Sequence, residues 1–143
     1  MLRFEDVNKT LNDDTIKFLF DLLKSKKFSI SHINLPSFEE HRNFVINNPY
    51  RSWNIIFEGQ NKIGAFYLGY DNSVGIHLSC KFELYFSRVV TLVESNFDAL
   101  PPSPSLRCSY LFFNVNPNDF LKVNALRDLG YEISQISFQK ICI

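Results

Sequence analysis

Apolar positions near the start of the chain recur at the spacing of a helix. The positions on this stripe are Ile16, Leu19, Phe20, Leu22 and Leu23. Asn12 and the acidic pair Asp13-Asp14 suit the first turn of a helix, and the basic residues within 24–27 suit its last turn. The pattern therefore predicts a helix between these two signals.

A second helix is predicted directly after Pro36. Ser37 is followed three residues later by Glu40, which is the spacing of a capping box, and Asn47-Asn48-Pro49 ends the helical pattern. We expect its inward face to consist of Phe38, Phe44 and Val45.

Three short apolar segments follow the helices and are separated by turn residues. They span residues 52–57, 62–68 and 74–78, with turns at 58–61 and 71–72. Short strands joined by tight turns predict an antiparallel meander.

The next segment, residues 84–100, returns to helical spacing. Its stripe consists of Tyr85, Val89, Leu92, Val93 and Phe97. Residues 101–105, rich in Pro and Ser, predict a stiff loop inside the domain. The apolar segment 110–115 then predicts a central strand covered on both faces.

The last part of the chain predicts one more helix, over residues 119–129, ended by Gly130. Residues 131–133 and 137–141 are expected to be extended. The whole order is helix, helix, meander, helix, strand, helix, strand. It predicts a single α/β (α+β) domain spanning residues 1–143, with a mixed, mostly antiparallel central sheet flanked by helices.

Composition excludes several classes of function. The chain has 143 residues, 45% hydrophobic and 21% charged, with fifteen basic and fifteen acidic residues that cancel. This balance argues against nucleic-acid binding, which needs a basic surplus on one face. Three scattered cysteines predict neither a disulfide framework nor a metal site. Since no stretch approaches about 20 apolar residues and the N-terminus is acidic, we expect no membrane association and a cytoplasmic location.

Two sets of residues resemble the GNAT superfamily of N-acetyltransferases, and together they cover the chain from about Leu23 onward. Asn116-Pro117-Asn118-Asp119, followed by Leu129-Gly130-Tyr131-Glu132, is similar to the segment in which an Asn-rich turn opens a helix that ends in Leu-Gly-Phe. The upstream positions that resemble a branch of small bacterial acetyltransferases are Ile30-Ser31-His32, Pro36, His41, Phe44-Val45, Pro49-Tyr50-Arg51-Ser52-Trp53, Ile63-Gly64 and Val74-Gly75-Ile76.

The resemblance implies the GNAT acyl-CoA N-acyltransferase fold and transfer of an acetyl group from acetyl-CoA to a small-molecule amine. The fourth strand of the family supplies a backbone N–H for the oxyanion, and the pantetheine arm lies between two splayed strands. Here these strands are residues 74–78 and 111–115. His77 is a candidate catalytic base, and the alternative is a half-buried strand histidine bonded to backbone. The positions implied for cofactor binding are Leu78, Ser79, Cys80, Lys81, Phe82, Asn116 and Asp119.

The cofactor side departs from the family pattern in two places. The family's phosphate loop after the fourth strand contains glycines, whereas residues 79–85 contain none and include Glu83. Lys81 could offset that charge, but it cannot replace converging N–H groups. In the last helix, Lys122 stands where a small residue is usual, and Leu126 stands where many members have a Tyr that acts as the general acid.

The acceptor side keeps more of the pattern. The resemblance implies an acceptor pocket shaped by His32, His41, Tyr50, Arg51 and Trp53. Arg51 could bind a phosphate or carboxylate, as in a nucleotide sugar, and the rings of Tyr50 and Trp53 could stack on a substrate. The alternatives are packing roles for the histidines and Trp53 and simple exposure for Arg51.

Two other hypotheses stay open. One is an inactive GNAT-like protein that binds a ligand or partner through the old acceptor pocket. The other is a homodimer built by the C-terminal strands, with Phe82, Tyr85 and Phe86 as partner contacts. Cys80 as a nucleophile is disfavoured, since His77 three residues away on a strand-to-loop path does not face it.

Overall fold

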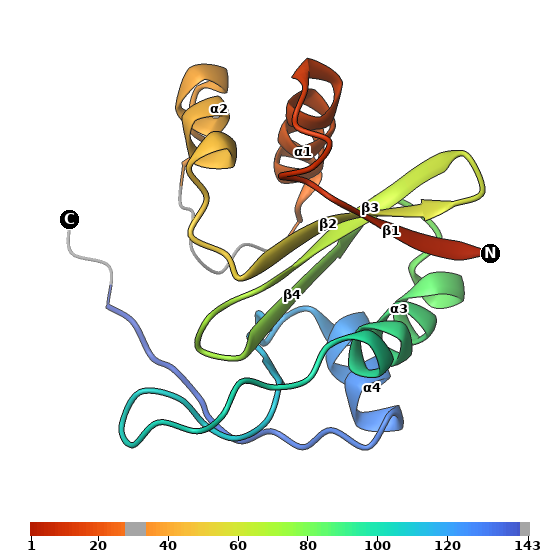
Figure 1. Cartoon of the computed structure of the whole chain (residues 1–143). Helices are drawn as coiled ribbons and strands as arrows, with labels where there is room; N and C mark the ends of the chain where they lie inside the picture. Colours follow the sequence, from red (N-terminus) through yellow and green to blue (C-terminus); the bar gives the residue numbers. More distant parts are fainter. Residues whose placement is uncertain (28–33, 141–143) are drawn as a thin grey trace.

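The computed structural model describes residues 1–27 and 34–140, which fold as a five-stranded sheet between two pairs of helices (Figure 1). The strand order is β1-β2-β3-β4-β5, antiparallel except for the parallel β4–β5 pair. Helices α1 and α2 cover one face, and α3 and α4 cover the other. The elements are β1 (Leu2–Asp6), α1 (Asp13–Ser25), α2 (Phe38–Ile46), β2 (Ser52–Glu58), β3 (Asn61–Leu68), β4 (Ser73–Leu78), α3 (Phe82–Asn96), β5 (Phe112–Phe113) and α4 (Phe120–Asp128). The predicted fold class is confirmed.

The caps predicted for the first two helices are present. Asn12 begins α1 by accepting a hydrogen bond from the Thr15 N–H at 2.8 Å. Ser37 and Glu40 form the complete capping box of α2. Each cap satisfies a backbone donor at the helix start that would otherwise have no partner.

The expected inward face of α2 is only partly right. Val45 is buried, but Phe38 and Phe44 are 38% and 43% exposed, and His41 faces inward in their place. The two phenylalanine rings turn sideways to neighbouring rings: Phe38 packs against Phe20 of α1, and Phe44 against Tyr50. These ring contacts hold Phe38 and Phe44 at the edges of the helix pair and not in its core.

The predicted meander is confirmed as β2–β3–β4, with Gly59 at φ +60° in the first turn. Strand β1 is an addition that the periodicity did not predict. It pairs along its whole length with β2, and its Phe4 packs edge-on against Phe66 at 4.6 Å between ring centroids. A five-residue strand whose partner lies about fifty residues away is stabilised by pairing that a local pattern does not reveal.

The predicted central strand at 110–115 is wrong in length and place. Only Phe112–Phe113 is a strand, and β5 lies at the edge of the described sheet with two residue pairs to β4. The final extended segment also forms no strand over residues 131–140, and its Ile133, Ile136 and Phe138 are 60%, 70% and 93% exposed. Neither segment is flanked on both sides by described strands, so neither becomes central.

The end of α4 matches the expectation. Gly130 has a φ of +94°, its N–H donates to the Arg127 carbonyl, and the Tyr131 N–H donates to the Leu126 carbonyl. These two bonds form a Schellman motif, which ends the helix. The Tyr131 hydroxyl then donates to the Glu94 carboxylate, which ties the end of α4 to α3.

Asn72 joins the β3–β4 turn to the loop after α3. It is fully buried at a φ of +74°. Its side-chain N–H groups donate to the carbonyls of Leu100 and Cys108 at 3.0 and 2.9 Å, and its oxygen accepts from the Leu100 N–H at 2.7 Å. Its own carbonyl accepts from the Phe112 N–H, so one residue positions both β4 and β5.

Candidate active site

Strands β4 and β5 diverge after a short contact. They pair only at Ser73↔Phe112 and Val74↔Phe113, and over Gly75–Leu78 no strand of the described chain lies on that edge of β4. The backbone groups on this edge therefore have no strand partner among the described residues, and those without another partner can pair with a ligand. One of them, the Ile76 carbonyl, accepts a hydrogen bond at 3.0 Å from the Nζ of Lys122, which reaches it from α4.

His77 lies on the face of β4 that α1 and α2 cover. It pairs across the sheet with Ala65, which belongs to the core under these helices, and its side chain is half-buried. Burial and the positive charges of Lys26 and Lys122 lower the pKa of His77 to about 4. The imidazole is therefore neutral at pH 7 and able to accept a proton, although a pKa this low makes it a weak base.

An aromatic wall stands beside His77 on the same face. Tyr50 stacks on Tyr67 with ring centroids 4.2 Å apart and 13° between planes, and Trp53 meets Tyr50 edge-on at 5.1 Å. Tyr67 lies opposite Gly75, where an added Cβ would come within 2.2 Å of its ring. Glycine at 75 thus lets the Tyr67 ring lie against the strand.

The structure brings the rings of Tyr50 and Trp53 together, as the sequence predicts, and adds Tyr67, which was not among the predicted site residues. The sequence places Tyr67 on a meander strand, two residues after Ala65. Its pairing with Gly75 across the sheet is seen only in the structure. Burial, with the neighbouring Tyr67, raises the pKa of Tyr50 to about 12, so its phenol stays protonated at neutral pH.

The other predicted acceptor residues lie elsewhere. The Arg51 guanidinium donates to the Asp98 carbonyl at 2.8 Å and so holds the loop after α3. His41 is 5% exposed between α1 and α2, with its ring centroid 5.3 Å from that of Phe20. His32 lies outside the described residues. Substrate binding by these residues stays a prediction.

The turn after β4 is built without glycine. Both the N–H and the hydroxyl of Ser79 donate to the Ile63 carbonyl, at 2.8 and 3.0 Å. Cys80 is exposed, and Lys81 precedes α3 in the left-handed conformation, with φ 48° and no side-chain cap. Within this turn, the left-handed conformation is thus adopted by Lys81 and not by a glycine.

The start of α4 positions Lys122. Asn116 accepts a hydrogen bond from the Asn118 N–H at 2.9 Å, and Asp119 caps the helix by accepting from the Lys122 N–H at 3.3 Å. The Asp119 carboxylate is also 3.9 Å from the Lys122 Nζ. Asn116 and Asp119 therefore form the helix opening, and their contact with a cofactor stays a prediction.

Comparison with known proteins gives a result only at the level of structure. No family model and no curated protein matches the chain. A domain from Methanocaldococcus jannaschii DSM 2661 matches with a TM-score of 0.65 at 15% identity, covering 96% of this chain and 92% of that one. A possible acetyltransferase from Clostridium difficile 630 matches with a TM-score of 0.60 at 8% identity over 100% and 99%. AAC(6')-Iy, in complex with the bisubstrate analogue CoA-S-monomethyl-acetylneamine, matches with a TM-score of 0.61 at 12% identity over 99% of both chains.

The chain has the GNAT fold. Within this fold β4 and β5 pair at two positions and then separate, as the resemblance implied. Binding of pyrophosphate at the turn into α3 stays a prediction. Tyr85 and Phe86 of α3 are 7% and 1% exposed in the core, so the expectation that they contact a partner is wrong. Phe82 stacks on Phe86 at 4.5 Å, and Leu78 packs against the same core.

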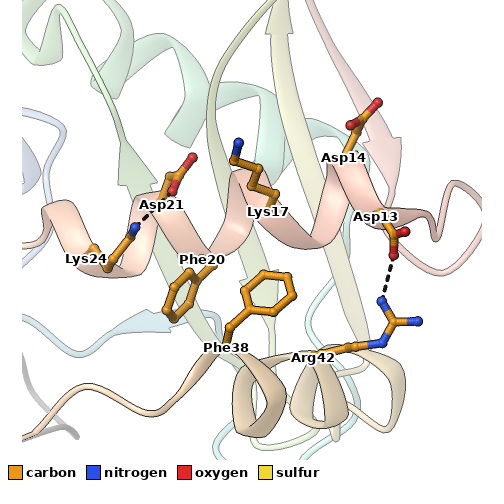
Figure 2. Close-up of a pocket in the computed structure, with 8 residues that line it drawn as sticks. All are labelled: Asp13, Asp14, Lys17, Phe20, Asp21, Lys24, Phe38 and Arg42. Atoms are coloured by element: carbon orange, nitrogen blue, oxygen red, sulfur yellow. Dashed lines mark hydrogen bonds and ion pairs between the residues drawn. The ribbon is translucent and has the colours of Figure 1, made fainter.

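A hollow between α1 and α2 is lined mainly by charged side chains, unlike the aromatic wall beside His77 (Figure 2). It encloses about 500 Å³, and its charges include two ion pairs, Arg42–Asp13 at 2.6 Å and Lys24–Asp21 at 3.3 Å. None of the predicted site residues that the structure describes lines it. Among the described residues, no three His, Cys, Asp or Glu side chains are grouped to hold a metal ion. No helix in that part of the chain is long and apolar enough to cross a membrane.

Proposed function

We propose that this protein is an N-acyltransferase that moves an acetyl group from acetyl-CoA to the primary amine of a small acceptor. The observation that carries the proposal is the open edge of β4 over Gly75–Leu78, which lies beside His77 and the Tyr50–Tyr67–Trp53 wall. A pantetheine arm has amide groups that can pair with such an edge, as an added strand does.

The residues present fit the pantetheine arm better than the pyrophosphate. No described residue accepts from the N–H groups of Phe82 and Glu83 at the start of α3, where a helix favours anions. However, the Ser79 N–H is already bonded to Ile63, and the Glu83 carboxylate opposes an anion. Affinity for acetyl-CoA is therefore expected to come mainly from the arm.

The chemistry needs a neutral amine, a proton acceptor and a stabilised oxyanion. The amine attacks the thioester carbonyl, its proton passes to neutral His77 directly or through a water, and the thiolate leaves as coenzyme A. A backbone N–H of β4 is the proposed oxyanion donor. The flat aromatic wall suits the ring of an amino sugar or nucleotide sugar, which is the acceptor class we propose.

Binding of acetyl-CoA tests the proposal directly. At 100 times its dissociation constant, a ligand that binds only the folded state adds about 2.7 kcal/mol to stability. We expect acetyl-CoA to raise the melting temperature, Lys81→Glu to reduce that rise, and Asp128→Asn, on the exposed far end of α4, to leave it unchanged. Absence of any rise at millimolar acetyl-CoA would overturn the proposal.

Turnover is the second test. With glucosamine-type amines as acceptors, release of free thiol should depend on both substrates, and His77→Gln should slow it while leaving acetyl-CoA binding intact. Thiol release that is equally fast without an added amine would contradict transfer to an external acceptor.

A non-catalytic binding protein is the second candidate, favoured by Glu83 and by the Lys122 contact on β4. It predicts that a sugar ligand stabilises the fold whereas acetyl-CoA does not. The same melting experiment, with each ligand added separately, distinguishes the two candidates.

We also propose a homodimer built by the C-terminal segment. Over residues 132–140 no backbone hydrogen bond to the described chain is present, three large apolar side chains are exposed, and β5 ends the described sheet. Such an edge is a template for pairing with another strand. Sedimentation of the full chain should show a dimer that a chain ending at Glu132 does not form, and a monomer in both cases would contradict it.

A further inference from the structure

Lys122 stands inside the splay that the proposed arm would enter. It belongs to the first turn of α4, and its Nζ bonds to the Ile76 carbonyl, on the open edge of β4. Its side chain is 24% exposed, and its one described acidic neighbour within 4 Å, Asp119, is at the limit of an ion pair at 3.9 Å. The amine is thus partly withdrawn from water and weakly paired.

These surroundings raise the fraction of the amine that is neutral. Burial, together with the charge of Lys26, lowers the pKa of Lys122, and Asp119 offsets this only in part. A neutral lysine amine is a nucleophile toward acyl groups, and lysines are activated in this way by desolvation and by neighbouring cations.

We infer that Lys122 is itself an acyl acceptor, so that the chain acetylates its own Lys122 when acetyl-CoA is bound and no external amine is present. This inference rests on the proposed function, because it requires the arm of acetyl-CoA to lie along β4. A pantetheine amide that pairs with the Ile76 carbonyl displaces the Lys122 Nζ from that carbonyl and leaves the amine beside the arm.

The step balances without any further reactant. The Nζ lone pair attacks the thioester carbonyl carbon, a C–N bond forms, and the C–S bond breaks. The proton lost from Nζ goes to the departing thiolate, directly or through water or His77. The products are N-acetyl-Lys122 and free coenzyme A.

Acetylation has a local consequence that a purely accidental modification elsewhere would not share. The low pKa of His77 comes first from burial and then from the charges of Lys26 and Lys122, and acetylation removes the charge that Lys122 carries in its protonated form. The pKa of His77 should therefore rise after the reaction, while burial and Lys26 still hold it below its ordinary value.

The test uses the full chain, incubated with acetyl-CoA and no acceptor, followed by intact mass and peptide mapping. We expect one acetyl group on Lys122, formed at least tenfold faster than on the exposed Lys81 in the turn before α3. When the chain is first unfolded in urea, this preference for Lys122 should disappear. Lys122→Arg, which keeps the charge but not the nucleophile, should bind acetyl-CoA and remain unmodified.

The outcomes separate the inference from the proposed function. A rise in melting temperature with acetyl-CoA, but no acetyl group on Lys122, would overturn the inference and leave the proposed function standing. Equal labelling of Lys81 and Lys122 would also overturn it, as a chemical side reaction. Failure of acetyl-CoA to bind would overturn both. A rise in the pKa of His77 on acetylation, followed by NMR, would support the local consequence drawn for the site.

Discussion

Replacing Asn72 by alanine removes the connection between the β3–β4 turn and the loop after α3. The side chain makes three hydrogen bonds, two to carbonyls and one from the Leu100 N–H, at 2.7–3.0 Å. Each such bond stabilises a protein by about 1 kcal/mol, and a buried partner left without one is costly. Since the residue also has a φ of +74°, alanine adds about 1 kcal/mol of backbone strain. The expected total loss is about 4 kcal/mol.

Glycine at the same position separates the two contributions. Asn72→Gly loses the three hydrogen bonds but tolerates the left-handed backbone, so it should be less destabilised than Asn72→Ala by about 1 kcal/mol. Asn61→Ala, at an exposed asparagine on β3, is the matched control and should change stability by less than about 0.5 kcal/mol.

Urea unfolding followed by far-ultraviolet circular dichroism measures all three variants. If Asn72→Ala lies within about 1 kcal/mol of the wild type, the bonds do not carry the stability assigned to them. If Asn72→Gly is as unstable as Asn72→Ala, the assigned backbone strain is wrong. The backbone carbonyl of Asn72 also accepts a hydrogen bond from the Phe112 N–H. Loss of acetyl-CoA binding in either variant, while it is still folded, would show that the turn positions the β4–β5 splay.

Three further predictions concern the site. Gly75→Ala should displace the Tyr67 ring, since the new Cβ would lie 2.2 Å from it, and should raise KM for the acceptor more than KM for acetyl-CoA in steady-state assays. Lys81→Gly should raise the unfolding free energy by about 1 kcal/mol, because its left-handed conformation suits glycine, and a loss would contradict the strain assigned to Lys81. The depressed pKa of His77 means that the unfolded chain binds the proton more readily. Stability should therefore fall by up to about 3 kcal/mol as the pH drops from about 6.5 to about 4, and His77→Gln should remove that part of the pH dependence.

The elements with local signals were predictable from the sequence. The caps at Asn12 and Ser37 and the stop at Gly130 act within a few residues of themselves, so a short window contains the whole cause. Strand β1 and the edge position of β5 depend on partners far along the chain, and no local pattern contains that information.

The site shows the same division. Tyr50 and Trp53 are neighbours in sequence and stay neighbours in space, so their predicted association is seen in the structure. Tyr67 joins them only through the register of β3 against β4. The bond from Lys122 to Ile76 spans 46 residues, and the sequence shows only that a lysine stands where a small residue is usual. Its position in the splay follows from the start of α4.

The aromatic wall also has an optical consequence. Trp53 is the single tryptophan of the chain, it is 8% exposed, and its ring lies 5.1 Å from Tyr50 and 5.9 Å from Phe44. Its fluorescence therefore comes from one place in the molecule, the proposed acceptor side. A ring bound against Tyr50 should change the intensity or wavelength of that emission without any attached dye, which gives a direct titration signal for screening amine acceptors one by one.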